Sequence, residues 1–261
     1  MRPSELTKMF ELEDSYWWFV ARRKLILTLV ARYLPPTPAE RPVILDIGCG
    51  TGATLTGLSR FGDAFGVDFS RHALQYCRRR DHCALVRSRG EALPFADASA
   101  HLITALDLLE HIPDDAAAVR EFARVLRPGG VLLITVPAGP MLWSEHDEAL
   151  DHLRRYRSRE LRRALEGAGL EVERLSPCIT FLLLPIALLR FLQRLWPRRR
   201  GGPQTALIVP PKGINTLLIK LLALEHRWLL RFNLPAGVSL LAVARKRGPA
   251  LLSERAAPGV R

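Results

Sequence analysis

Three glycines at alternate positions follow an acidic residue near the end of a short apolar run. The run is Val43–Ile47, with Asp46 as its acid, and the glycines are Gly48, Gly50 and Gly52. An apolar run bounded by turn residues is typical of a buried parallel strand. Glycines let the chain turn sharply and let a ligand approach the backbone closely. We interpret this stretch as a strand and loop that bind a nucleotide-like ligand at the start of the next helix.

The acid beside the loop indicates which kind of ligand binds there. The carboxylate of Asp46 attracts an ammonium group and repels a pyrophosphate, and the DxGxGxG spacing differs from the GxGxxG of dinucleotide-binding loops. A second acid, Asp68, follows at about the spacing expected for a residue that accepts hydrogen bonds from ribose hydroxyls. For this motif alone, a glycine-rich turn without a ligand is the alternative.

Two further segments follow expected strands. Residues 90–97, with the sequence GEALPFAD, form a loop of small residues that can cover one face of a purine. Residues 106–113, LDLLEHIP, follow the fourth expected strand, at the edge where open α/β sheets bind ligands. Together with the glycine loop and Val67–Ser70, they resemble the motifs of class I S-adenosylmethionine-dependent methyltransferases, in the type 11 group of small-molecule and quinone-type enzymes.

The resemblance covers residues 43–175, and it implies S-adenosyl-L-methionine as the cofactor. Acids at strand ends would hold the methionine part and the ribose, small and apolar residues would flank the adenine, and an arginine of the N-terminal segment would pair with the cofactor carboxylate. The implied cofactor-binding residues are Asp46, Gly48, Gly50, Asp68, Phe69, Glu91, Ala92, Leu93, Leu106 and Arg23.

Methyl transfer depends mainly on the alignment of the acceptor with the methyl group, and a base is needed only where the acceptor loses a proton. Asp107 and His111 follow the fourth strand and are candidate bases. A polar cluster after the fifth strand contributes His146, which we prefer as the base. A solvated loop with a helix cap is the alternative interpretation of this cluster. Its predicted substrate contacts are Trp143, Arg154, Arg155 and Tyr156.

A metal ion is the remaining possibility for the segment after the fourth strand. Asp107, Glu110 and His111 have helical spacing, and divalent ions accept such ligands. Helix capping and packing beside Pro113 explain the same residues without an ion, and we therefore predict no metal site. The four cysteines contain no CxxC pair and match no zinc ribbon.

Strand and helix patterns alternate from Val43 onward, which predicts βαβ crossovers. We expect an α/β fold: a Rossmann-like, doubly wound, seven-stranded and mostly parallel sheet with an N-terminal helical cap and a hydrophobic helical insertion before the last strand. The expected units are a cap at 1–40, the cofactor-binding domain at 41–176, the insertion at 177–234, the last strand at 235–247 and a flexible tail at 248–261.

The chain of 261 residues has a formal net charge of +12, carried largely by arginine. This balance suits nucleic acid, anionic lipid or an anionic substrate. Enzymes that methylate adenine N6 usually have Asn/Asp-Pro-Pro-aromatic after the fourth strand, and this chain does not. We therefore expect no nucleic-acid partner. No signal peptide is visible at the N-terminus, which favours a cytoplasmic location.

The insertion combines leucine-rich runs with basic residues at helical spacing, in residues 179–200 and 214–234. Its uncharged stretches are shorter than the about 20 residues that span a bilayer. Such helices can lie in a membrane interface or cover an apolar acceptor, and ordinary packing on the domain is the alternative. We predict possible peripheral contact with the inner face of the membrane.

These observations favour a methyltransferase that acts on a small or lipid-linked acceptor, with oxygen as the expected acceptor atom. The alternatives are an RNA methyltransferase, suggested by the net charge of +12, and a non-catalytic membrane-associated protein that retains the fold. Salt-dependent RNA affinity would favour the first alternative. The absence of cofactor binding would favour the second.

Overall fold

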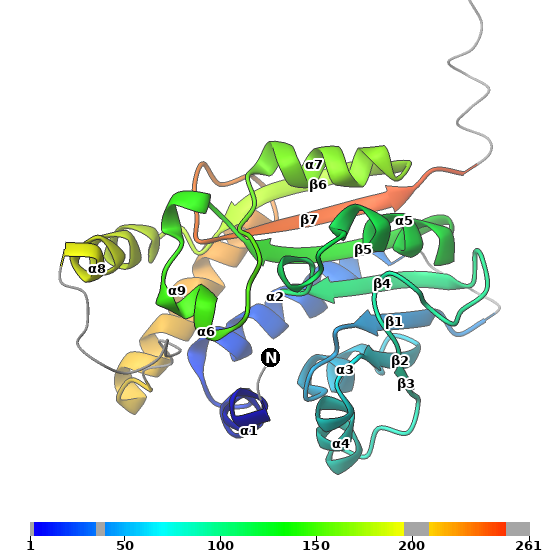
Figure 1. The fold of residues 1–261 in the computed structure, drawn as a ribbon, viewed down its shortest axis with the longest axis horizontal. Helices are drawn as coiled ribbons and strands as arrows, with labels where there is room; N and C mark the ends of the chain where they lie inside the picture. The colour runs from blue at the N-terminus through cyan, green and yellow to red at the C-terminus, as the bar shows by residue number, and fades with distance from the viewer. Residues whose placement is uncertain (1–2, 35–39, 196–208, 249–261) are drawn as a thin grey trace, which may run out of the picture.

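The computed structural model describes residues 3–34, 40–195 and 209–248. These residues form one mixed sheet with helices on both faces (Figure 1), as the alternating pattern predicts. The strands are β1 (Val43–Ile47), β2 (Asp63–Asp68), β3 (Leu85–Arg87), β4 (Ala100–Leu106), β5 (Leu126–Pro137), β6 (Leu170–Cys178) and β7 (Ser239–Lys246).

The seven strands have the order β3-β2-β1-β4-β5-β7-β6. Strands β1 to β5 are parallel, and β7 is antiparallel to both of its neighbours. The chain leaves β1 toward β2 and β3 and then returns to place β4 on the other side of β1. This reversal opens a crevice at the carboxyl ends of β1 and β4, where ligands bind in such sheets.

The helices divide between the two faces of the sheet. They are α1 (Pro3–Leu12), α2 (Trp17–Tyr33), α3 (Ala53–Leu58), α4 (Arg71–Arg79), α5 (Asp115–Val125), α6 (Glu145–Ala149), α7 (Ser158–Gly167), α8 (Leu183–Leu195) and α9 (Lys212–Leu229), with short 3-10 helices η1 (Leu109–His111) and η2 (Pro140–Leu142).

Each face of the sheet has its own apolar core. Phe122 of α5 and Leu161 of α7 are fully buried against one face. Ile26 of α2 and Leu229 of α9 are fully buried in the cluster on the other. Burial of each such side chain contributes about 1.5–3 kcal/mol. Helix α2 is therefore part of the core as well as of the expected N-terminal cap, because its apolar side chains cover strands that would otherwise face water.

Two strands are longer than the sequence pattern predicts. Strand β5 begins at Leu126, which pairs with Ala100 before an irregularity shifts the register to Leu102 opposite Val131. Residues 127–130, RPGG, are typical of a turn and are here an irregular part of the strand. Strand β6 continues to Cys178, which pairs with Ser239 of β7, so the two antiparallel strands stay paired up to the chain that enters and leaves the insertion.

The insertion folds into α8 and α9, as its leucine periodicity predicts. Helix α9 packs on α2, and Glu225 accepts hydrogen bonds from the backbone N–H groups of Ile179 and Thr180, the latter at 2.9 Å. In Figure 1 the parallel strands point toward the side of the molecule where α6, α8 and α9 lie. Arg198–Arg200 and residues 249–261 of the expected tail lie outside the described residues. Within the described residues, each helix is too short or too polar to cross a membrane.

Candidate active site

The loop after β1 has the backbone conformation that its glycines predict. Gly48, Gly50 and Gly52 all have positive φ, of 72°, 55° and 88°. The N–H of Gly48 donates to the carbonyl oxygen of Val67 at 2.7 Å, which ties the loop to β2. A Cβ atom at Gly48 would lie 2.8 Å from Cδ1 of Leu108, so a side chain there would clash with Leu108 and would also strain the backbone at this positive φ. The loop therefore requires glycine at position 48.

Two carboxylates on neighbouring strands lie beside this loop. Asp46 is buried and accepts a hydrogen bond from the hydroxyl of Thr104 at 2.6 Å. Burial raises the pKa of Asp46 to about 6, although the Thr104 hydrogen bond opposes that rise. Asp68 accepts hydrogen bonds from the N–H groups of Gly50 at 3.0 Å and Ser70 at 2.7 Å. Burial raises the pKa of Asp68 as well, and these backbone bonds oppose it.

Asp107 joins the strand ends to the N-terminal helices. It follows β4 with φ of 52°, a left-handed conformation that costs a non-glycine residue about 1–3 kcal/mol. Its carboxylate accepts from the hydroxyl of Thr135 at 3.0 Å and forms an ion pair with Arg22 of α2. The next arginine, Arg23, pairs with Asp14 at 3.2 Å and lines a small cleft together with Asp46. Arg22 thus joins α2 to the end of β4, whereas Arg23 joins α2 to the chain between α1 and α2.

The residues expected near the adenine do not all face the cavity: Phe69 and Glu91 line it, whereas Leu93 lies in the core. Phe69 is 55% exposed, and the guanidinium groups of Arg87 and Arg89 lie over its ring, at 5.4 and 5.0 Å from the centroid. Glu91 faces the same cavity as Phe69. Leu93 is buried in the core, where its N–H donates to Glu121 at 2.7 Å. Ala92 is exposed beside it.

A cavity of about 1030 Å³ connects the strand ends to the helices above them. Small-molecule sites usually occupy about 300–1,000 Å³, so this one has room for a cofactor and an acceptor together. The strand-end part of its lining includes Gly48, Gly50, Asp68, Phe69, Leu106 and Asp107. The opposite part includes Trp17, Trp18, Ile179, Leu182, Ile186, Leu189 and Leu218.

The three predicted catalytic residues all lie on the wall of this cavity: Asp107, His111 and His146. Burial lowers the pKa of each of the two imidazoles to about 4. Each imidazole is therefore neutral near pH 7 and able to accept a proton. The choice of His146 as the base stays a prediction.

The predicted substrate contacts separate into two groups. Arg155 lines the cavity, and its guanidinium donates to Asp147 at 2.8 Å and to the carbonyl oxygen of Ala138 at 2.7 Å. Arg154 and Tyr156 instead turn to Asp115 of α5, the tyrosine hydroxyl donating at 2.6 Å. The indole N–H of Trp143 donates to Glu148 at 3.4 Å. Arg154 and Tyr156 thus join α5 to the chain before α7.

Sequence reasoning passed over His152, which also lines the cavity. Its Nδ1 lies 3.0 Å from Oδ1 of Asp147, whose side chain is fully buried. Burial alone would raise the pKa of Asp147, but the hydrogen bond from His152 and the charge of Arg155 bring that pKa well below its usual range. The signal in the sequence is an acid, a histidine and an arginine within residues 147–155, and only the fold shows that they meet.

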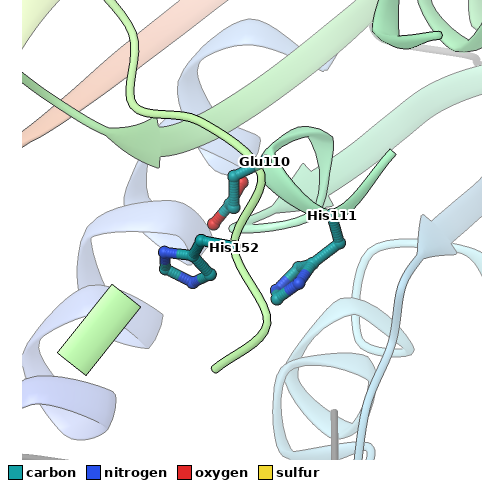
Figure 2. A group of neighbouring side chains, drawn as sticks. All are labelled: Glu110, His111 and His152. Carbon is teal, nitrogen blue, oxygen red and sulfur yellow. The ribbon is translucent and has the colours of Figure 1, made fainter. Parts of the chain in front are cut away.

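Figure 2 shows His152 beside two residues that follow β4. One carboxylate oxygen of Glu110 and one ring nitrogen each of His111 and His152 lie within 4.8 Å of one another. The imidazole centroids are 4.9 Å apart, edge to face. Glu110 is fully buried, and burial raises its pKa well above the usual value, with the charge of Asp107 adding to the rise.

The family model for a methyltransferase domain matches residues 45–134. A probable S-adenosylmethionine-dependent methyltransferase of Mycolicibacterium smegmatis is 33% identical over 168 residues, covering 62% of each chain. Residues 45–134 are thus similar to the domain of class I S-adenosylmethionine-dependent methyltransferases. A ubiquinone biosynthesis O-methyltransferase of Alkalilimnicola ehrlichii is 37% identical over 147 residues, covering 50% of this chain and 59% of that protein.

The fold of the methyltransferase domain and its surroundings also matches solved structures. A methyltransferase of Thermotoga maritima described as a possible histamine N-methyltransferase superposes with a TM-score of 0.58 at 17% identity, over 94% of this chain and 96% of that one. The match to the curated relatives is shorter, since it spans about three fifths of their length, 62% and 59% for the two named above.

The cofactor of this family is S-adenosyl-L-methionine, and the residues at the strand ends fit it. The loop at Gly48 leaves no room for a side chain, so the backbone itself can meet the ligand. Asp46 is a buried carboxylate next to that loop and can hold an ammonium group. Asp68 keeps lone pairs for ribose hydroxyls beyond its two backbone hydrogen bonds, because each carboxylate oxygen can accept more than once.

Proposed function

We propose that this chain is a methyltransferase that transfers the methyl group of S-adenosylmethionine to a hydroxyl oxygen of a small, lipophilic acceptor. The observation that supports this proposal best is the single cavity that joins Gly48 and Asp68 to an apolar wall on the insertion. A cofactor on the strand ends would present its methyl group to an acceptor that lies against Ile179, Leu182 and Leu218. Alignment of this kind contributes about 7–11 kcal/mol to a two-reactant step.

The bound cofactor supplies a methyl group on a positively charged sulfur. The acceptor hydroxyl passes its proton to an imidazole that faces the cavity, His146 in our prediction. The oxygen then forms its bond to the methyl carbon while the carbon–sulfur bond breaks, with the electron pair staying on sulfur. Because burial lowers the pKa of His146 to about 4, the imidazole is neutral at pH 7, although it holds a proton less strongly than an ordinary histidine does.

Two relatives whose names contain O-methyl or O-demethyl support an oxygen acceptor. One is the ubiquinone biosynthesis O-methyltransferase described above, and another, 34% identical over 125 residues, is a 27-O-demethylrifamycin SV methyltransferase of Amycolatopsis mediterranei. The matched stretches span 59% and 45% of these proteins. Oxygen as the acceptor atom therefore remains part of the proposal for this chain.

The test is transfer of a labelled methyl group to separate pools of lipid extract, quinone precursors, small phenols and RNA. We expect label in an apolar hydroxyl compound, identified by mass spectrometry, with wild type but not with Gly48→Val. His146→Ala should lower the rate and leave cofactor affinity unchanged. Label in RNA would favour the RNA methyltransferase, and cofactor binding without any labelled product would favour a non-catalytic protein.

We also propose that the insertion contacts an anionic membrane surface. Helix α9 carries an exposed apolar stripe at helical spacing, and Lys220 and Arg227 are exposed beside it. Leu189 of α8 is 47% exposed and also lines the cavity, so an acceptor could pass from a lipid layer to the cofactor. Apolar and basic side chains together favour the interface of anionic lipid. The α9 stripe consists of Ile214, Leu217, Leu221, Leu224 and Trp228.

Co-sedimentation with lipid vesicles tests this second proposal. We expect binding to vesicles that contain phosphatidylserine, weaker binding at high salt, and little binding to phosphatidylcholine alone. Equal recovery with both kinds of vesicle would contradict a role for the basic residues. No recovery with either would contradict membrane contact.

A further inference from the structure

Glu110 is the least satisfied polar side chain near the cavity. It is fully buried, and neither of its carboxylate oxygens has a hydrogen-bond partner among the residues that the structure describes. The neighbouring cations are already engaged, since Arg22 pairs with Asp107 and Arg155 with Asp147. A buried carboxylate without a partner is costly, so native proteins place a proton, a water or an ion beside it.

Two imidazoles lie close to this carboxylate, those of His111 and His152. Nδ1 of His152 bonds to the Asp147 carboxylate at 3.0 Å, and Nδ1 of His111 lies 3.4 Å from the carbonyl oxygen of Asp151. Because carboxylates and carbonyls only accept hydrogen bonds, each Nδ1 carries the proton and each Nε2 keeps its lone pair. Hydrogen bonds of this kind orient the histidines of metal sites.

We propose that Glu110, His111 and His152 bind one divalent transition-metal ion at the acceptor side of the cavity. The ligand atoms lie within 4.8 Å of one another, and an ion with bonds of about 2.1 Å would draw them somewhat closer. Two imidazoles and one carboxylate suit Zn²⁺, Fe²⁺ or Co²⁺ better than Mg²⁺ or Ca²⁺, which prefer oxygen. Figure 2 shows the three side chains turned toward one another.

Three protein ligands leave a coordination position for another molecule. All three residues line the cavity that also contains Gly48 and Asp68, so this position would face the acceptor. An ion there would polarise an acceptor hydroxyl and make its proton easier to remove. The polarisation of an acceptor hydroxyl rests on the proposed function. The binding of the ion does not, because it depends on the three side chains alone.

The test uses the untagged full chain, freed of metal with a chelator and titrated with Co²⁺ and Zn²⁺. We expect one ion per chain by calorimetry, with ligand-field absorption in the visible for Co²⁺. Glu110→Gln and His152→Ala should each weaken binding by at least about tenfold. His72→Ala is the matched control, because His72 is an exposed histidine of α4, and it should bind as wild type does.

Affinity for S-adenosylmethionine and far-ultraviolet circular dichroism show whether each variant is folded. If Glu110→Gln does not fold, the metal affinities of His152→Ala and His111→Ala are compared with that of wild type instead. Wild type that binds no Co²⁺, or unchanged affinity in the folded variants, would overturn the site. Displacement of Co²⁺ by equimolar Mg²⁺ would contradict the assignment of two histidine nitrogens as ligands, because Mg²⁺ prefers oxygen. Cofactor binding without metal binding would leave the proposed function standing, whereas loss of cofactor binding in wild type would count against that function.

Discussion

The strand-end floor of the cavity and its helical cover differ in how the chain builds them. We define the floor as Asp46, the loop at residues 48–52, and Asp68, all within β1, β2 and the turn between them. The cover consists of α1, the start of α2, α6, α8 and α9, which come from the N-terminal segment, the chain after β5 and the insertion. The floor depends on local backbone conformation, such as the positive φ of Gly48. The cover depends on contacts between distant residues, such as the Arg22–Asp107 ion pair.

This difference separates two kinds of sensitivity. Substitutions in the floor should remove cofactor binding, because the ligand meets the backbone and two carboxylates there. Substitutions in the cover should change stability, lipid contact or acceptor use while cofactor binding persists. The following predictions test that separation, beginning with the largest expected effect.

Gly48→Val should abolish measurable binding of S-adenosylmethionine. The new Cβ would lie 2.8 Å from Leu108, at a φ of 72° that a β-branched residue rarely adopts. Gly167→Ala is the matched control, because a Cβ there meets nothing within 4 Å. Calorimetry should show the control binding as wild type does. Binding by Gly48→Val at wild-type affinity would mean that the cofactor does not lie on this loop.

Asp147→Ala should lower the free energy of unfolding by about 3–5 kcal/mol, because it leaves Arg155 buried without its carboxylate. Asp97→Ala removes an exposed partner of Arg124 and should cost less than about 1 kcal/mol. Urea unfolding of both variants checks the difference. Equal losses would show that the buried network of the cover contributes no more than a surface ion pair.

Asp68→Ala should weaken cofactor binding about 10- to 100-fold, because hydrogen bonds to a charged carboxylate contribute about 1.5–3 kcal/mol each. Its side chain also holds the N–H groups of Gly50 and Ser70, so Asp68→Asn should lose less than Asp68→Ala. Calorimetric titration of the two variants measures the difference. Affinity unchanged in both would remove Asp68 from the floor.

Leu217→Glu in the α9 stripe should lower binding to anionic vesicles by about tenfold and leave cofactor affinity unchanged, because Leu217 is 55% exposed. Gln75→Glu adds the same charge on exposed α4 and should bind vesicles as wild type does. Co-sedimentation measures both. A parallel loss in the control would mean that net charge, and not the stripe, determines recovery.

Cofactor affinity should fall about fourfold between pH 7.5 and pH 5.5. Burial raises the pKa of Asp46 to about 6, and the ionised form, present above that pH, is the one that attracts an ammonium group. The charges of Arg22 and Asp68 act on Asp46 in opposite directions and are included in this value. Asp46→Asn should flatten the profile. The same slope in Asp46→Asn would assign the pH dependence to another group.

The sequence predicts the floor well because its signals are local. Alternating glycines require positive φ, an apolar run predicts a buried strand, and strand ends meet at one edge of a parallel sheet. The doubly wound, seven-stranded and mostly parallel sheet is confirmed. The start of β5 at Leu126 is not predicted, because Pro128 and the two glycines after it are typical of a turn. In the structure the chain pairs with β4 on both sides of these residues.

The cover is harder to predict because its contacts join residues far apart in sequence. Arg22 and Arg23 are adjacent in the sequence and equally able to pair with the cofactor carboxylate, yet the structure pairs Arg22 with Asp107 after β4. His146 and His152 lie in the same polar segment, and the sequence does not show which imidazole is oriented by a partner. In the structure the buried carboxylate of Asp147 orients His152. Tyr156 reads as a substrate contact, yet its hydroxyl bonds to Asp115 on α5.

The most direct test is one calorimetric comparison of wild type, Gly48→Val and Leu217→Glu with S-adenosylmethionine. We expect wild type and Leu217→Glu each to bind one molecule with equal affinity, and folded Gly48→Val to bind none. Failure of folded wild type to bind the cofactor, or equal binding by Gly48→Val, would contradict this expectation.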